Sequence, residues 1–169
     1  MPLSKRCATR SSTAKSPAAS ARIGALLPTP TSFLSSKLPT AEATSQPAAE
    51  AAAFARRLEA WGYGALWIPE AVGRDPFSLI GYLAAQTERL HFATGIANIY
   101  ARDAMTMRAI QQTLGELSGG RLILGLGVSH AHLVSGVRGH EYGKPVSTMR
   151  SYLEAMEKAL YMGPVPEEP

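Results

Sequence analysis

The sequence lacks the features that mark disulfide-bonded, membrane-spanning and secreted proteins. Its single cysteine, Cys7, excludes a disulfide within the chain. No apolar run approaches the roughly 20 residues of a membrane-spanning helix, so we expect no membrane association. Residues 1–41 contain no acidic residue, although six basic residues lie there. The same region lacks the apolar stretch of a secretory signal, which favours a cytoplasmic location.

The net charge of +4 belongs to this first segment. Residues 42–169 carry 11 basic and 13 acidic residues, so the remainder is slightly negative. A nucleic-acid-binding domain needs a basic face on its folded part. We therefore expect no nucleic-acid partner.

The first 46 residues are rich in Ser, Thr, Ala and Pro, and their composition cannot build a core. A weak strand candidate lies near 22–27. The segment is predicted to be a disordered leader, with an organellar transit peptide as the alternative. The predicted organisation is a leader over 1–46, a folded region over 47–162 and a tail over 163–169.

The folded region alternates between two hydrophobic patterns. Helical spacing begins near Pro47, Asp75 and Asp103, and again after Pro145. The second pattern continues to about Arg89, and the apolar faces of the other three extend to Trp61, Leu117 and Leu160. Short apolar runs at 65–68, 90–99 and 122–128 are predicted strands, and a loop is predicted over 129–145. Strict alternation of strand and helix predicts an α/β fold with a parallel sheet. Two architectures fit: a partial (β/α)8 TIM-barrel-like fold with about four βα units, or an open doubly wound sheet.

Small and polar residues gather where the predicted strands end, which is where parallel folds bind ligands. The second strand ends at Glu70, the third at Gly95–Asn98 and the fourth at Gly127–His130. A plainer interpretation stays open for two of them. Glu70 could pair with Arg74 on an exposed loop, and Asn98 could satisfy backbone groups in a turn.

Other chemistries are less well supported by the spacing. His130 and His132 lack the usual zinc spacing and a third ligand, so no metal site is expected. Gly125 and Gly127 lack the third glycine of a dinucleotide-binding motif. We interpret these glycines as allowing the backbone to come close to a ligand.

Three segments together carry a resemblance to a known family. LEAWGYGALWIPE, LHFATGIANIYARD and LSGGRLILGLGVSH look like successive segments of the bacterial luciferase-like monooxygenase family. They look most like its coenzyme F420-dependent oxidoreductase branch. The order and spacing match from about Pro47 to Leu160, although no single motif is specific.

This resemblance implies a barrel that binds a flavin or deazaflavin at its strand ends. It implies hydride transfer to or from coenzyme F420, with an FMN-dependent monooxygenase as the alternative. In relatives a bulge in the third strand, often with a non-proline cis peptide, supports the ring. The residues that the resemblance implies as cofactor-binding are Glu70, Gly95, Ile96, Ala97, Asn98, Gly127, Val128 and Ser129, with His130 on the substrate side.

Two departures limit what the resemblance implies. Ala71 stands where several relatives have a histidine that serves in chemistry, so no catalytic residue is carried over. The second half of the family's barrel is not in this sequence. A half barrel leaves strand edges open, so either the chain is a truncated product or two copies pair as a homodimer to close the sheet. We expect weak or no turnover by an isolated monomer. A non-catalytic fragment or interaction module is the alternative from another class.

Overall fold

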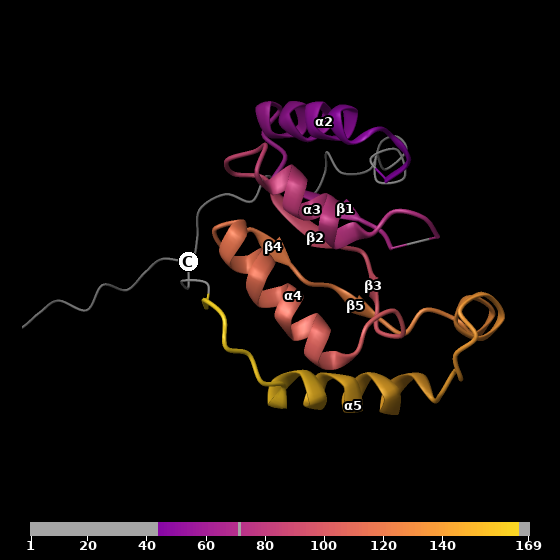
Figure 1. The fold of residues 1–169 in the computed structure, drawn as a ribbon. Coiled ribbons are helices and arrows are strands. Elements are labelled where there is room, and N and C mark those ends of the chain that lie inside the picture. Colours follow the sequence, from indigo (N-terminus) through magenta and orange to yellow (C-terminus); the bar gives the residue numbers. More distant parts are fainter. Residues whose placement is uncertain (1–43, 71, 166–169) are drawn as a thin grey trace, which may run out of the picture. The chain divides into compact units, whose positions relative to one another are not determined.

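A computed structural model describes residues 44–70 and 72–165 (Figure 1). Most of the predicted leader, with its strand candidate at 22–27, and residues 166–169 of the tail lie outside these residues. The described helices are α2 (Ala48–Ala60), α3 (Pro76–Ala84), α4 (Ala104–Leu117), the π-helix η2 (His132–Val137) and α5 (Pro145–Lys158). The strands are β1 (Ala65–Ile68), β2 (His91–Thr94), β3 (Ala97–Asn98), β4 (Leu122–Ile123) and β5 (Leu126–Gly127).

All strand pairs of the described region are parallel. One sheet has the order β1-β2-β4, and a second pairs β3 with β5. Helices α2, α3, α4 and α5 pack against one another in chain order, as Figure 1 shows. The α/β fold with parallel βα units is thus as predicted.

Two predicted strands are each divided in the structure. The run at 90–99 forms β2 and β3, and the run at 122–128 forms β4 and β5. The two breaks face each other, because the Thr94 side chain bonds to the Gly125 backbone where the ladder would continue. A side chain inserted between two strands replaces the backbone pairing that a continuous ladder needs. The prediction of one strand over each of these two runs was therefore wrong.

The helix ends follow the signals in the sequence. Asp75 and Asp103 cap α3 and α4, with their carboxylates accepting from Ser78 N at 2.7 Å and Thr106 N at 2.8 Å. Gly119 (φ 61°) follows α4 in the left-handed region. Helix α3 ends at Ala84, earlier than the predicted end near Arg89.

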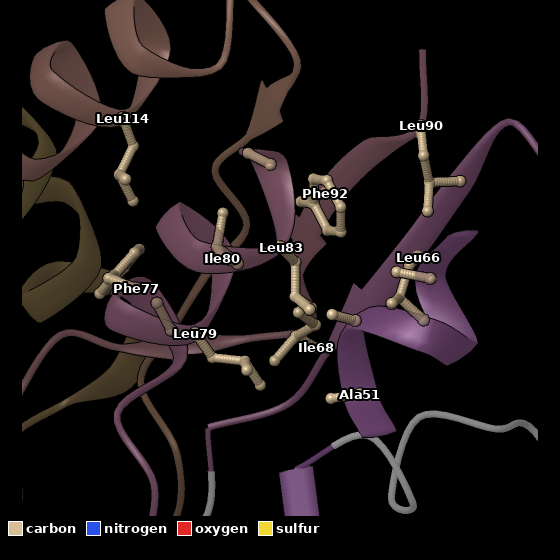
Figure 2. Close-up of a cluster of buried hydrophobic side chains, with 14 of the residues drawn as sticks. Ala51, Leu66, Ile68, Phe77, Leu79, Ile80, Leu83, Leu90, Phe92 and Leu114 are labelled. Carbon is tan, nitrogen blue, oxygen red and sulfur yellow. The ribbon is translucent and has the colours of Figure 1, made fainter. Parts of the chain in front are cut away.

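The hydrophobic core lies between the sheet and the helices (Figure 2). Leu66 and Ile68 of β1 and Phe92 of β2 point toward Ile80 and Leu83 of α3, and all five are buried. Burying a side chain of this size contributes about 1.5–3 kcal/mol. This packing holds β1 and β2 against α3, and the candidate site follows the ends of these strands.

The other face of the three-stranded sheet carries exposed apolar side chains. Trp67, Ala93 and Ile123 are aligned in register, and Trp67 and Ile123 are 45% and 43% exposed. Strand β1 pairs on one side only within the described residues. The homodimer expected to cover such edges stays a prediction.

Several residues predicted to line apolar helix faces are exposed instead. Trp61 and Leu160 lie just beyond α2 and α5, and Leu117 is the last residue of α4. At these helix ends the three side chains lie away from the core and are exposed. None of the helices in the described ranges is long and apolar enough to cross a membrane.

Candidate functional site

The predicted strand-end residues come together in the structure. Asn98 of β3 is in register with Gly127 of β5, and Ile99 N donates to the Gly127 carbonyl at 3.0 Å. Gly95 and Ile96 join β2 to β3 through a non-proline cis peptide, the feature that the resemblance implied at this bulge. We call residues Gly95–Asn98 and Gly127 the strand-end wall.

The glycines of the fourth strand serve the packing of this wall. A β-carbon on Gly127 would lie 2.6 Å from the Ile96 side chain, and one on Gly125 would lie 2.2 Å from the Thr94 carbonyl oxygen. The space above each glycine is therefore filled by the chain itself. That these glycines also allow the backbone to come close to a ligand stays a prediction. Their smallness lets Ile96 lie over Gly127 while staying 38% exposed.

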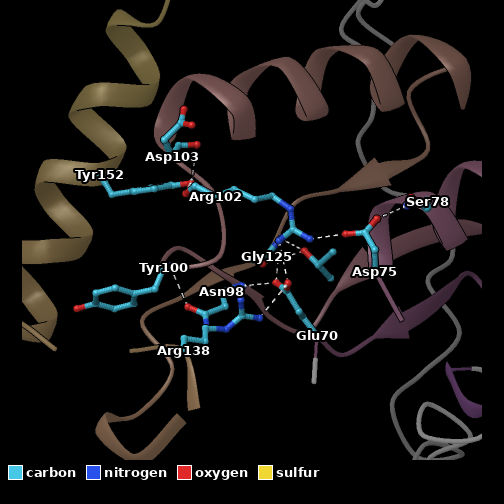
Figure 3. A network of polar contacts seen from close by, with 11 residues as sticks. Glu70, Asp75, Ser78, Asn98, Tyr100, Arg102, Asp103, Gly125, Arg138 and Tyr152 are labelled. Carbon is cyan, nitrogen blue, oxygen red and sulfur yellow. Dashed lines mark hydrogen bonds and ion pairs between the residues drawn. The ribbon is translucent and has the colours of Figure 1, made fainter. Parts of the chain in front are cut away.

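Glu70 follows β1 and reaches the wall with its carboxylate (Figure 3). Asn98 N donates to Glu70 Oε2 at 2.7 Å, and Arg102 Nη1 donates to both carboxylate oxygens at 2.8 and 3.0 Å. Arg138 adds an ion pair at 3.7 Å. Within the described part of the chain, the ion-pair partners of Glu70 are thus Arg102 and Arg138, and the expected pairing with Arg74 was wrong.

Arg102 links this carboxylate to the neighbouring elements. Its second arm pairs with Asp75, the cap of α3, and its guanidinium lies 4.6 Å from the ring centroid of Phe77. Burial opposes ionisation of Asp75, but hydrogen bonds from Ser78 and Arg102 outweigh it and lower its pKa. Burial, with the nearby Asp103 charge, raises the pKa of Tyr152 to about 12, so its hydroxyl stays protonated and donates to the Arg102 carbonyl at 2.9 Å.

Asn98 has one satisfied and one unsatisfied amide atom. Its Oδ1 accepts from Tyr100 N at 3.0 Å, which is the turn interaction considered as the plainer interpretation. Its Nδ2 is buried without a hydrogen-bond partner. An unpaired buried donor costs about 1–3 kcal/mol. This atom is therefore the one at the wall that a ligand acceptor would stabilise.

The segment after β5 is more ordered than the predicted loop. Ser129 has φ 56°, and its carbonyl accepts from the Tyr142 hydroxyl at 3.2 Å. The π-helix η2 follows, with Leu133 and Val134 donating to the His130 carbonyl. His130 itself is exposed. The loop prediction for 129–145 was wrong for His132–Val137, because these local bonds organise η2, whereas residues 139–144 form neither helix nor strand.

An open groove of about 560 Å³ runs from the wall to α5. Gly127 and Val128 form one side of it, and apolar residues of α5 form the other: Pro145, Val146, Met149 and Leu153. Its size lies in the range of small-molecule sites. The described residues hold no group of three or more side chains arranged for a metal ion.

The sequence did not reveal the arginines of this site. Arg102 lies at a strand end like Glu70 and has the opposite charge, which is a signal that could have paired them. Arg138 lies in the predicted loop and carries no such signal. Their roles depend on contacts between residues far apart in the chain.

The family model described as luciferase-like monooxygenase matches residues 31–168. The chain belongs to the luciferase-like family. It is 31% identical over 114 residues to a protein from Mycobacterium tuberculosis named as a coenzyme F420-dependent oxidoreductase, a match covering 68% of this chain and 33% of the relative. It is also 31% identical to the 5,10-methylenetetrahydromethanopterin reductase of Methanolobus tindarius, over 66% of this chain and 34% of that protein. The predicted family is thereby confirmed.

Solved structures agree on the luciferase-like fold. The coenzyme F420-dependent tetrahydromethanopterin reductase of Methanopyrus kandleri superposes with a TM-score of 0.61 at 19% identity, covering 71% of this chain and 40% of that one. The oxygenating constituent of 3,6-diketocamphane monooxygenase from Pseudomonas putida, solved with FMN, gives a TM-score of 0.58 at 20% identity, covering 68% and 36%. The chain spans about a third of the length of the curated relatives it matches.

Proposed function

We propose that the strand-end wall holds the ring of coenzyme F420 and that the chain serves hydride transfer between this deazaflavin and a small-molecule substrate. The single observation that carries the proposal is the combination at the wall of an exposed Ile96 side chain with the unpaired Asn98 Nδ2. An apolar surface beside an unpaired donor suits a flat ring whose edge carries acceptors. The relative named as F420-dependent supports this cofactor.

The residues present fit such a ring without rearranging the sheet. Ile96 lies over Gly127, whose missing β-carbon leaves room for it, and part of its side chain stays exposed. Ser129 and Val128 continue the wall, and His130 lies at its substrate side. When bound, the deazaflavin supplies the ring carbon that accepts or releases hydride; the chain's residues orient the ring and exclude water from one face of it.

One specific observation supports FMN as the alternative cofactor. The luciferase-like monooxygenase from Pseudomonas putida was solved with FMN. An isoalloxazine ring has the same flat shape and a similar acceptor edge, so the same wall suits FMN. The runner-up function is accordingly an FMN-dependent monooxygenase.

Titration of the purified chain with coenzyme F420 and, separately, with FMN tests the proposal. The side chain of Trp67 lies against Gly95, 3.1 Å from where its β-carbon would be. Trp67 fluorescence should therefore be quenched when a ring occupies the wall. We expect saturable quenching by coenzyme F420 at lower concentrations than by FMN. The reverse order would favour the monooxygenase, and no saturation with either would contradict both.

The Ile96→Ala variant tests whether the cofactor ring binds at the strand-end wall. Removing this exposed wall side chain should weaken cofactor binding about tenfold, because it removes an apolar contact. Leu117→Ala is the matched control, since Leu117 is also apolar and exposed but lies at the end of α4, away from the wall. Equal affinities of the two variants would show that the ring binds elsewhere.

A further inference from the structure

Glu70 holds the wall at two points, one on each side of Ala97. Its backbone N donates to the Ile96 carbonyl at 3.3 Å, and its carboxylate Oε2 accepts from Asn98 N at 2.7 Å. These bonds connect the end of β1 to the bulge between β2 and β3. The position of residues 96–98 therefore depends in part on Glu70, through its backbone N–H at Ile96 and its carboxylate at Asn98.

Both oxygens of the Glu70 carboxylate accept hydrogen bonds. Arg102 contacts both oxygens, Arg138 approaches Oε1 and Asn98 N occupies Oε2. The side chain is only 5% exposed. Three hydrogen bonds use most of its acceptor capacity, and a carboxylate with so little surface is not open to a ligand. The resemblance had implied that Glu70 binds the cofactor, and the geometry points to a different role.

We propose that Glu70 is a positioning residue that acts on the cofactor only through the wall residues Ile96–Asn98. This inference rests on the function proposed above. Arg102 keeps the carboxylate in place, and its bond to Asp75 ties it to the start of α3. Loss of the carboxylate leaves the wall residues in the chain but lets them shift, which misplaces the surface that meets the ring.

The chain offers a matched control for the loss of such a carboxylate. Glu59 at the end of α2 also accepts backbone N–H groups, those of Glu88, Arg89 and Leu90, at 3.0, 2.5 and 2.8 Å. It holds the segment that enters β2, whereas Glu70 holds the segment that leaves it. Glu59→Gln therefore removes the same chemistry at the other end of the strand.

A binding cycle between Glu70 and Ile96 tests the proposal. Glu70→Gln replaces one acceptor oxygen by an NH2 group and should weaken coenzyme F420 binding about tenfold. In the Ile96→Ala background the same change should weaken binding less than about twofold, because the wall contact is already lost. Glu59→Gln should leave binding unchanged, and Glu70→Asp should recover part of the affinity. Equal losses in both backgrounds would overturn the proposal, since Glu70 would then act independently of Ile96.

A second measurement needs no cofactor. In ¹H–¹⁵N spectra, Glu70→Gln should move the backbone amide signals of Ile96, Ala97 and Asn98 and the side-chain amide signals of Asn98, whereas Glu59→Gln should not. Unmoved wall signals would overturn the positioning role. If the native chain binds neither coenzyme F420 nor FMN, the proposed function is wrong, and these spectra alone decide the role of Glu70. If Glu70→Gln does not fold by circular dichroism, Arg102→Lys, which loosens the same carboxylate, takes its place in both measurements.

Discussion

Thr94 and Gly125 exchange two hydrogen bonds through a single hydroxyl group. The Thr94 Oγ1 donates to the Gly125 carbonyl at 2.8 Å and accepts from the Gly125 N–H at 2.9 Å. The contact lies at the break between β2 and β3 and at the break between β4 and β5, so it joins the two places where the sheet divides.

Gly125→Ala should destabilise the chain by about 2–3 kcal/mol. A β-carbon there would lie 2.2 Å from the backbone oxygen of Thr94, and a backbone atom cannot move aside cheaply. Urea unfolding followed by circular dichroism measures the change. Gly64→Ala is the control, because nothing lies within 4 Å of its added carbon and its φ is not in the left-handed region. Equal stabilities of the two variants would contradict the packing described here.

Thr94→Val should cost about 1–3 kcal/mol while keeping the shape of the side chain. The Gly125 N–H loses its partner, and a buried donor left unpaired carries that cost. The Gly125 carbonyl keeps its bond from Ala97 N at 2.8 Å, so only one group is left unsatisfied. Thr94→Ser retains the hydroxyl and should lose less in the same urea titration. A larger loss in the serine variant would mean that the methyl group, rather than the hydroxyl, is what matters.

Protonation of Glu59 should lower the free energy of unfolding of the chain at acidic pH. The hydrogen bond from the Arg89 backbone N–H, with those from Leu90 and Glu88, outweighs burial and lowers the pKa of Glu59 below its ordinary 4.5. A depressed folded-state pKa adds stability above the unfolded pKa, and this stability is lost as the pH falls through the folded value. The stability difference between the native chain and Glu59→Gln should therefore shrink from about pH 6 toward about pH 3. A constant difference would show that ionisation of Glu59 adds nothing.

Much of the fold could be predicted because its signals are local. Asp75 and Asp103 precede apolar helical spacing, and both cap helices in the structure. The alternation of strand and helix likewise needs only hydrophobic period and length, and the parallel sheet follows from it.

The parts that could not be predicted rest on contacts between distant positions. The division of both long strands comes from Thr94 meeting Gly125, which are 31 positions apart. The pairing of Glu70 with Arg102 joins residues 32 positions apart, where each charge alone reads as an exposed loop residue. Strand-end positions located the candidate site, but which side chains hold it together depended on three-dimensional packing.

Among the arginines of residues 44–165 outside the candidate site, we expect Arg121 to be the most sensitive to substitution. Its guanidinium donates to the carbonyls of Ser118, Leu90 and Ala84 at 2.7, 3.1 and 2.8 Å and to the Thr87 hydroxyl at 3.1 Å. These bonds join the ends of α3 and α4 to the start of β2. Arg121→Lys cannot reproduce the planar fork and should cost about 2 kcal/mol in urea unfolding.

Arg89→Lys is the comparison for this prediction. The Arg89 side chain is 73% exposed, and its ion pair with Glu88 spans 3.8 Å. Exposed pairs of this kind contribute about 0–1 kcal/mol, so the exchange should leave stability nearly unchanged. The two variants differ only in what the guanidinium touches. If Arg121→Lys loses no more stability than Arg89→Lys, water replaces the guanidinium as the partner of the carbonyls around Arg121. The ends of α3 and α4 would then not depend on the planar guanidinium.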